Sequence, residues 1–238
     1  MSTQENFDYC SNLVRRRDED RWIAAHYAPP PERAALAALY ALHFEIERVP
    51  SLVSEAPLGE IRLQWWREAL DEIGEGRPRA HPAVQAAHAL EIADARARQA
   101  FNEAIDARAR LFYGEPFASV EDLAAFLLRA DAFVAPIAAR RLTANLSHAD
   151  EYAVEEAALA NALARYGRAL APALVGDIFA RAEELHRRAA PVLRAMPANA
   201  MPAFAHFSLT RTYLRRDRGP SPIGRRLRVF AAVASGRI

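Results

Sequence analysis

The chain has 238 residues, of which 52% are hydrophobic and 26% charged, the composition of a globular protein with a substantial core. Its net charge is +1, and the arginines alternate with acidic residues, so the electrostatic signature of nucleic-acid binding is missing and we expect no nucleic-acid partner. Every basic residue is Arg and none is Lys, which excludes Schiff-base chemistry through a lysine.

The single cysteine, Cys10, excludes an internal disulfide and a cysteine-based metal cage, and it fits a reducing compartment. The first twenty residues lack the apolar run of a signal peptide, and no stretch reaches the ~20 apolar residues of a membrane span. We therefore expect a cytoplasmic protein, with peripheral contact to the inner membrane left open.

The residues that dominate the chain are strong helix formers, whereas Val and Ile are sparse, so we expect an all-α protein. Hydrophobic periodicity with proline and glycine punctuation predicts helices in this order: 5–27, 31–49, 58–76, 81–94, 95–113, 119–145, 149–179 with a break at Pro172, 178–195 and 200–217.

The pattern predicts a single domain over 1–217. After it, 218-RGPSPIG-224 combines two glycines and two prolines, so we expect 218–238 to be a loosely attached, Arg-rich tail. The basic patch over 211–228 is interpreted as a solvated helix end followed by a mobile tail, in preference to a site for an anionic partner or a membrane surface.

The scattered histidines have no metal-ligand spacing, and no nucleophile motif or Gly-rich phosphate loop occurs, so we expect neither a metal site nor a catalytic residue of those kinds. Acids four residues apart share a helix face and can hold Mg²⁺ together. The candidate pairs are Asp71 with Glu75 and Glu151 with Glu155, and both are interpreted as solvated faces. Glu45 and Glu47 remain, on a helix that Pro50 interrupts.

Four segments resemble the squalene/phytoene synthase family. They are 21-RWIAAHYAPPPERAALAALYALHFEIERV-49, 62-RLQWWREALDEIGEGRPRAHPAV-84, 157-AALANALARYGRAL-170 and 180-ARAEELHRRAAPVLRAMP-197. The resemblance implies an isoprenoid-synthase-like helical bundle around a central cavity. It also implies, for active members, head-to-head joining of two isoprenyl diphosphates, with Mg²⁺ held between acidic motifs on facing helices.

This sequence departs from both acidic motifs of that family. On the first motif, Asp-x-x-x-Asp, it has Glu47 and, at the second acid, Ser51, with Arg48 and Pro50 between them. On the second motif the match runs through Arg165, Arg168 and Ala169 to Ala173, without an acid. The resemblance therefore implies a remnant cavity or ligand site formed by Tyr40, Phe44, Glu47, Ser51, Trp66, Arg165 and Arg168, with Arg168 opposite Glu47.

From this departure we expect a catalytically degenerate family member, without metal or cofactor, that acts as a binding or assembly factor. Its partner would be a protein or an apolar isoprenoid-like ligand. The segments 53-VSE-55 and 64-QWW-66 resemble the family's mitochondrial complex I assembly-factor branch, so a membrane respiratory complex is the implied setting. Two alternatives stay open: a Mg²⁺-dependent prenyltransferase with an altered metal site using Glu45, Glu47 or the acids at 71–75, and a non-catalytic isoprenoid or lipid carrier.

Overall fold

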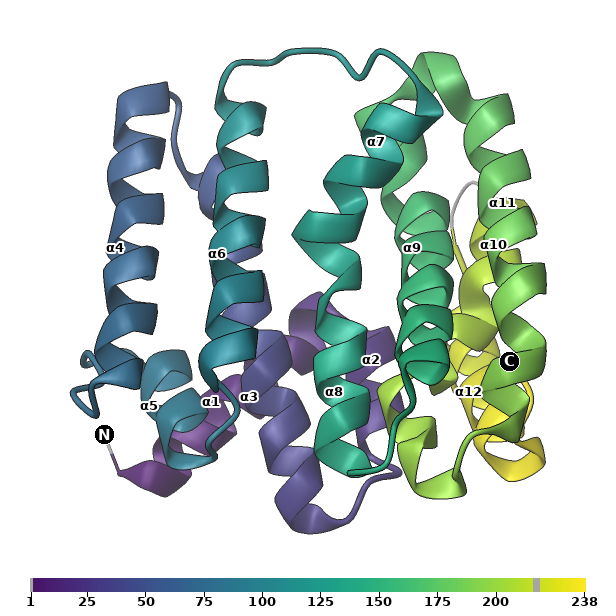
Figure 1. Cartoon of the computed structure of the whole chain (residues 1–238), viewed down its shortest axis with the longest axis horizontal. Coiled ribbons are helices and arrows are strands. Elements are labelled where there is room, and N and C mark those ends of the chain that lie inside the picture. Colours follow the sequence, from purple (N-terminus) through teal and green to yellow (C-terminus); the bar gives the residue numbers. More distant parts are fainter. Residues whose placement is uncertain (1, 216–218) are drawn as a thin grey trace. The chain divides into compact units, whose positions relative to one another are not determined.

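The computed structural model describes residues 2–215 and 219–238, and within these ranges every regular element is helical (Figure 1). The chain forms two compact units. Unit 1 runs to Trp22 and resumes over Pro30–Glu115, and unit 2 contains Ile23–Pro29 and Pro116–Ile238. The sequence predicts one domain over 1–217, whereas the contacts divide the chain into these two units.

Unit 1 is built from two groups of packed helices. In the first group α1, α3 and α5 pack against one another, and in the second α4 packs against α6. Their bounds, with those of the short helices between them, are α1 Thr3–Arg17, α2 Glu19–Ala25, α3 Pro30–Glu47, η1 Val49–Leu52, α4 Ala56–Gly74, α5 Pro82–Ala89, α6 Ala95–Ala109 and η2 Arg110–Phe112; the end of α2, from Ile23, belongs to unit 2.

The helix predicted over 5–27 is divided at Asp18. The backbone N–H of Asp18 donates to the Val14 carbonyl and closes α1, and its carboxylate accepts a hydrogen bond from the Arg21 backbone N–H, 3.2 Å away, in the first turn of α2. Aspartate suits such a boundary because its short side chain satisfies backbone donors at a helix start.

Unit 2 is centred on the long helices α9 and α10, which lie side by side (Figure 1). Its elements are α7 Val120–Leu127, the π-helical turn η3 Leu128–Ala132, α8 Val134–Leu142, α9 His148–Leu170, η4 Pro172–Leu174, α10 Val175–Ala195, η5 Ala198–Ala203, η6 Ala205–Leu209, α11 Thr210–Arg215 and α12 Pro222–Ser235.

Two prolines of unit 2 lie where the predicted helices are compared with the structure. The break expected at Pro172 is confirmed, because α9 ends at Leu170 and a 3₁₀ turn begins at Pro172. The single helix predicted over 200–217 is wrong: Pro202 lies inside a 3₁₀ segment, and α-helix resumes only at Thr210. A proline inside an α-helix removes a backbone donor and clashes with the preceding turn.

The segment predicted as a loose tail contains α12. Within it Val229 is fully buried and Ala232 is 2% exposed, and the helix packs against η6 and η5. Residue 218 lies outside the described residues. The expectation that 218–238 is only loosely attached stays a prediction.

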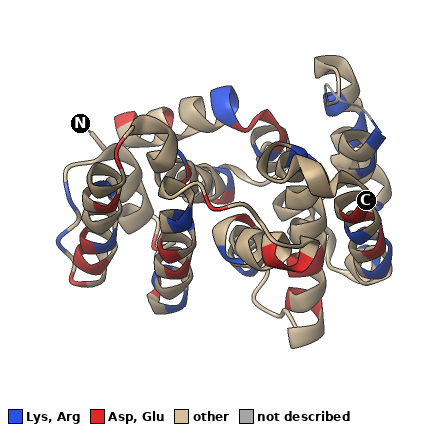
Figure 2. Ribbon diagram, turned by 90° about the horizontal axis from the view of Figure 1, so that it is seen from above, with Lys and Arg blue, Asp and Glu red and all other residues tan. Residues whose placement is uncertain are grey.

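Charged residues are distributed over the helices of both units, with arginines and acids interspersed (Figure 2). Among the described residues, no helix combines the length and the hydropathy needed to cross a membrane.

Candidate functional site

The end of α3 carries the residues that occupy the first acidic motif. Pro50 has no N–H to continue the helix, so α3 ends at Glu47 and the chain turns into η1. The Arg48 carbonyl then accepts two hydrogen bonds from Ser51, one from its backbone N–H at 2.9 Å and one from its hydroxyl at 2.7 Å. The Ser51 side chain is thereby held against the local backbone.

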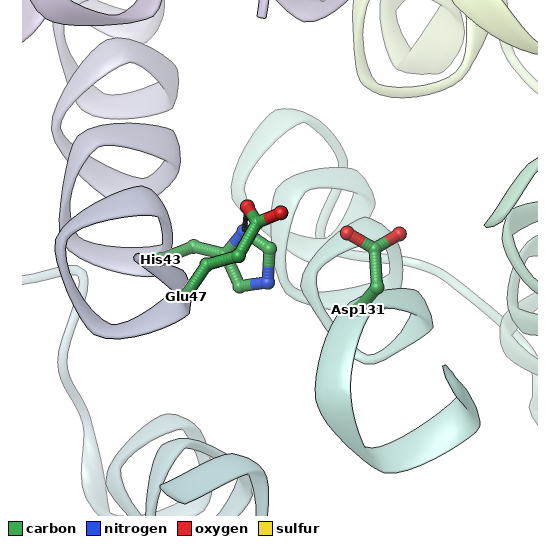
Figure 3. A group of neighbouring side chains, drawn as sticks. All are labelled: His43, Glu47 and Asp131. Atoms are coloured by element: carbon green, nitrogen blue, oxygen red, sulfur yellow. Dashed lines mark ion pairs between the residues drawn. The ribbon is translucent and has the colours of Figure 1, made fainter. Parts of the chain in front are cut away.

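Glu45 and Glu47 lie on opposite faces of α3, because two helical residues are about 200° apart. Tyr40, Phe44 and Glu47 follow the spacing of one face, and we call this side, together with His43, the Glu47 face. Figure 3 shows His43 and Glu47 projecting from the same side of α3, with His43 Nδ1 3.9 Å from Glu47 Oε2.

The Glu47 face is rich in cations within unit 1. His43 is 1% exposed, and its two ring nitrogens lie 3.4 Å from Arg21 Nη1 and 3.3 Å from Arg108 Nη2. A neutral imidazole accepts a hydrogen bond at one nitrogen only, so one of the two guanidiniums donates to His43 while the other faces an N–H. Arg21 also forms an ion pair with Asp18 at 3.3 Å.

The predicted aromatic residues on this face are covered by guanidinium groups. Arg21 lies over the Tyr40 ring at 5.5 Å, and Arg17 lies over the Phe44 ring at 5.9 Å. Burial raises the pKa of the Tyr40 phenol well above its usual range, so the hydroxyl stays neutral.

These residues of unit 1 do not fit the magnesium site that the family's active members imply. Mg²⁺ prefers several oxygen ligands, usually carboxylates, and bridges them to substrate phosphates. Of the two motif acids, only Glu47 is present, the Ser51 hydroxyl is held by the Arg48 carbonyl, and Arg21 and Arg108 place positive charge beside His43. Figure 3 also draws Asp131, which is carried by η3 of unit 2.

On the other side of α3, Glu45 lies in a small pocket of about 240 Å³, which we call the Glu45 pocket. Glu45 is 2% exposed. It accepts a hydrogen bond of 2.6 Å from the Tyr9 hydroxyl and forms an ion pair with Arg48 at 2.8 Å. The residues lining the pocket are Glu45, Arg48, Val49, Leu52, Arg62, Trp65, Trp66 and His81.

Aromatic rings form one side of the Glu45 pocket. Trp66 packs edge-on against Trp65 at 4.9 Å and against His81 at 5.1 Å. His81 caps α5, its Nδ1 accepting from the Ala83 backbone N–H at 3.2 Å, which directs the proton of the neutral ring to Nε2. Burial lowers the pKa of His81, and burial together with the bond to Glu45 raises that of Tyr9.

The structure thus groups the predicted site residues of unit 1 differently from the sequence. Tyr40, Phe44 and Glu47 share one face of α3, whereas Trp66 lies with Glu45 in the pocket beside the other face. Sequence reasoning missed the Glu45–Arg48 ion pair, although an acid three residues before an arginine on a helix is a signal for one. Tyr9 and His81 could not be found, because they come from distant segments.

Arg165 and Arg168 belong to α9 in unit 2. Arg165 lies over the rings of Tyr166 and Tyr213 at 5.1 and 5.8 Å, and Arg168 lies over the Phe179 ring at 5.2 Å. The expected position of Arg168 opposite Glu47 concerns two separate units and stays a prediction.

A second concavity, of about 700 Å³, lies on unit 1 along α4, and we call it the α4 groove. Along it α4 exposes an apolar stripe, in which Leu58 is 50%, Ile61 65% and Trp65 37% exposed. The groove is lined by Pro57, Glu60, Ile61, Leu63, Gln64, Trp65, Arg67, Glu68 and Ala109. A row of bulky apolar side chains with a polar rim is typical of a surface that binds another protein.

The model of the squalene/phytoene synthase family matches residues 14–171, more than half of the chain. The chain belongs to the squalene/phytoene synthase family. The resemblance found in its sequence is therefore confirmed.

Comparison with solved structures confirms the all-α isoprenoid synthase fold. A dehydrosqualene synthase in complex with ligand superposes with a TM-score of 0.73 at 14% identity, covering 98% of this chain and 96% of that one. The squalene synthase HpnC from Alicyclobacillus acidocaldarius gives a TM-score of 0.72 at 14% identity, covering 98% and 95%. At this identity the likeness establishes the fold alone.

A curated relative has a different role. NADH dehydrogenase (ubiquinone) complex I, assembly factor 6, from Bos taurus is 30% identical over 76 residues. The match covers 32% of this chain and 23% of the relative. The chain is thus similar in part to a protein named for the assembly of a respiratory complex.

Proposed function

We propose that this member of the squalene/phytoene synthase family is not a prenyltransferase but a cytoplasmic binding factor that assists assembly of a membrane respiratory complex. The observation that carries the proposal is the first acidic motif. Ser51 replaces its second acid and is bonded to the Arg48 carbonyl, and Glu47 is left as the only carboxylate of the motif.

The chemistry of prenyl transfer supports this conclusion. Ionising an allylic diphosphate requires cations that neutralise the charge developing on the leaving group. The positive charge on this face comes from Arg21 and Arg108, whose guanidiniums are buried beside His43. Arginines alone do not replace a metal cluster that is held by carboxylates on facing helices.

The partner we propose is a protein that docks on the α4 groove. The exposed stripe of Leu58, Ile61 and Trp65 supplies large apolar side chains, the kind of residue that anchors interfaces. The surrounding rim is polar and carries both signs of charge, with Arg67 paired to Asp106 and Glu60 accepting from Tyr113. The similarity to a complex I assembly factor supports a respiratory subunit as the class of partner.

The direct test of the missing activity is incubation of the purified chain with labelled farnesyl or geranylgeranyl diphosphate, Mg²⁺ and a reductant, followed by product extraction. An active family member serves as the positive control. We expect no presqualene-type or prephytoene-type product. A product that disappears in Glu47→Gln would contradict the proposal and establish the transferase, and stoichiometric extraction of an isoprenoid without turnover would establish a carrier.

A further inference from the structure

Helix α12 presents an apolar stripe that its own packing does not use. Ile223, Leu227 and Phe230 are 74%, 62% and 56% exposed, and their i, i+4, i+7 spacing places them along one side of the helix. The other side packs into unit 2 through Val229 and Ala232. The helix is therefore anchored through one face and offers a second apolar face outward.

The charged side chains of the segment that carries this stripe have a single sign. Residues 219–238 contain four arginines and no acidic residue. At about 100° per residue, Arg226 lies to one side of the stripe and Arg228 to the other. Bulky apolar side chains bordered by arginines make the surface complementary to one that is apolar inside and anionic at its edge.

We infer that α12 docks this chain on the surface of an anionic lipid bilayer. Leu227, Phe230 and Ile223 would enter the boundary between headgroups and acyl chains, as amphipathic helices lying in the membrane plane do. The guanidinium of Arg228 would meet lipid phosphates, which arginine binds through charge-assisted hydrogen bonds.

A second copy of the chain is a poorer occupant of the same stripe. In a two-fold contact each patch meets itself, so the arginines of the two α12 segments, which contain no acid, would be brought together. A lipid surface avoids this repulsion and, being fluid, adapts to three separately protruding side chains. Charge thus favours the bilayer.

This inference adds a lipid contact to the proposed function and rests on neither the protein partner nor the missing activity. Its test uses the purified full chain and vesicles, without any respiratory subunit. If the chain does not bind vesicles, the proposals of a protein partner on the α4 groove and of a missing condensation activity still stand.

The test is co-sedimentation with phosphatidylcholine vesicles, with and without phosphatidylserine, at low and high salt. We expect binding that needs the anionic lipid and falls with salt. Leu227→Asp and Phe230→Asp should each weaken it by about tenfold or more, because a charge replaces a membrane-entering side chain. Arg228→Glu should reduce the preference for anionic lipid.

Matched controls separate α12 from general effects. Ile61→Asp puts the same charge on the exposed stripe of α4, and Arg15→Glu reverses an exposed arginine on α1; both should bind vesicles normally. Equal binding to neutral and anionic vesicles, or equal loss in Ile61→Asp and Leu227→Asp, would overturn the inference. So would sedimentation velocity without lipid that shows a dimer which Leu227→Asp dissociates, since a second copy would then cover the stripe.

Discussion

The Glu45 carboxylate and the Arg48 guanidinium form an ion pair of 2.8 Å at the end of α3. Glu45 is 2% exposed, and the Tyr9 hydroxyl donates to its other oxygen. Both carboxylate oxygens are therefore engaged within the protein. Glu45 thus links Tyr9 of α1 to Arg48 at the end of α3.

Replacing Glu45 by alanine should destabilise the protein. The change leaves the Tyr9 hydroxyl and Arg48 without their acceptor, and breaking a buried charged network costs about 3 kcal/mol when one partner can still reach water, as the half-exposed Arg48 can. Urea unfolding followed by circular dichroism measures the loss. The control is Glu103→Ala, an exposed acid within α6, which should change stability by less than about 0.5 kcal/mol. A Glu45 variant as stable as the control would show that the ion pair and the Tyr9 bond stabilise nothing.

Acid should destabilise unit 2 through His186. Burial, and then the charge of Arg211, lowers the pKa of His186 to about 4, and the side chain is 3% exposed. The unfolded chain takes up this proton near pH 6.5, so as pH falls from 6.5 towards 4 the unfolded state binds more protons and the free energy of unfolding decreases. The contribution reaches up to about 3 kcal/mol.

The measurement is the free energy of unfolding against pH for the parent chain and for His186→Leu. The variant should lose most of the decline between pH 6.5 and 4, whereas His148→Gln, which changes an exposed histidine, should keep it. Parallel pH profiles for the parent and His186→Leu would mean that His186 is protonated equally in both states.

Close approach of α9 and α10 depends on Gly167. A Cβ at this position would lie 2.7 Å from Ile178 Cγ2, the branch next to the backbone, so the helices would have to shift. We expect Gly167→Ala to cost about 1–3 kcal/mol despite its better helix propensity. Gly176→Ala is the matched control, since its Cβ would have no neighbour within 4 Å.

Thermal or urea unfolding of both glycine variants checks the prediction. The double variant Gly167→Ala with Ile178→Ala should lose less than the sum of the single losses, because the smaller side chain makes room for the new methyl group. Additive losses, or equal stability of the two glycine variants, would contradict close packing at this point.

The sequence predicted most of the helices, because alanine-rich periodicity and proline punctuation are local signals. The break at Pro172 and the end of α3 before Pro50 follow from the missing proline N–H alone. The division at Asp18 was not predicted, because aspartate is also found inside helices and does not by itself mark a helix end. For 200–217 the apolar periodicity predicted one helix, but the segment around Pro202 forms a 3₁₀ helix instead.

The sequence predicted part of the candidate site. The contacts that it did not predict are made between helices that are distant in the sequence. The loss of the second motif acid can be read from Ser51 directly, and so can the presence of Arg48. That Arg48 turns to Glu45, and that Tyr9 and His81 meet it there, depends on the packing of α1 and α5 against α3, which no local pattern encodes. The exposure of Ile61 and Leu227 is likewise a property of the folded surface.

The most direct test of the central claim is rescue of respiratory complex assembly in the host cell lacking this chain, measured as assembled complex on a native gel. We predict that the parent chain and Glu47→Gln restore assembly equally, while Ile61→Asp, an exposed change on the α4 groove that leaves the fold intact, does not. Rescue by Ile61→Asp together with failure of Glu47→Gln would contradict the account, because function would then depend on the motif carboxylate and not on the binding surface.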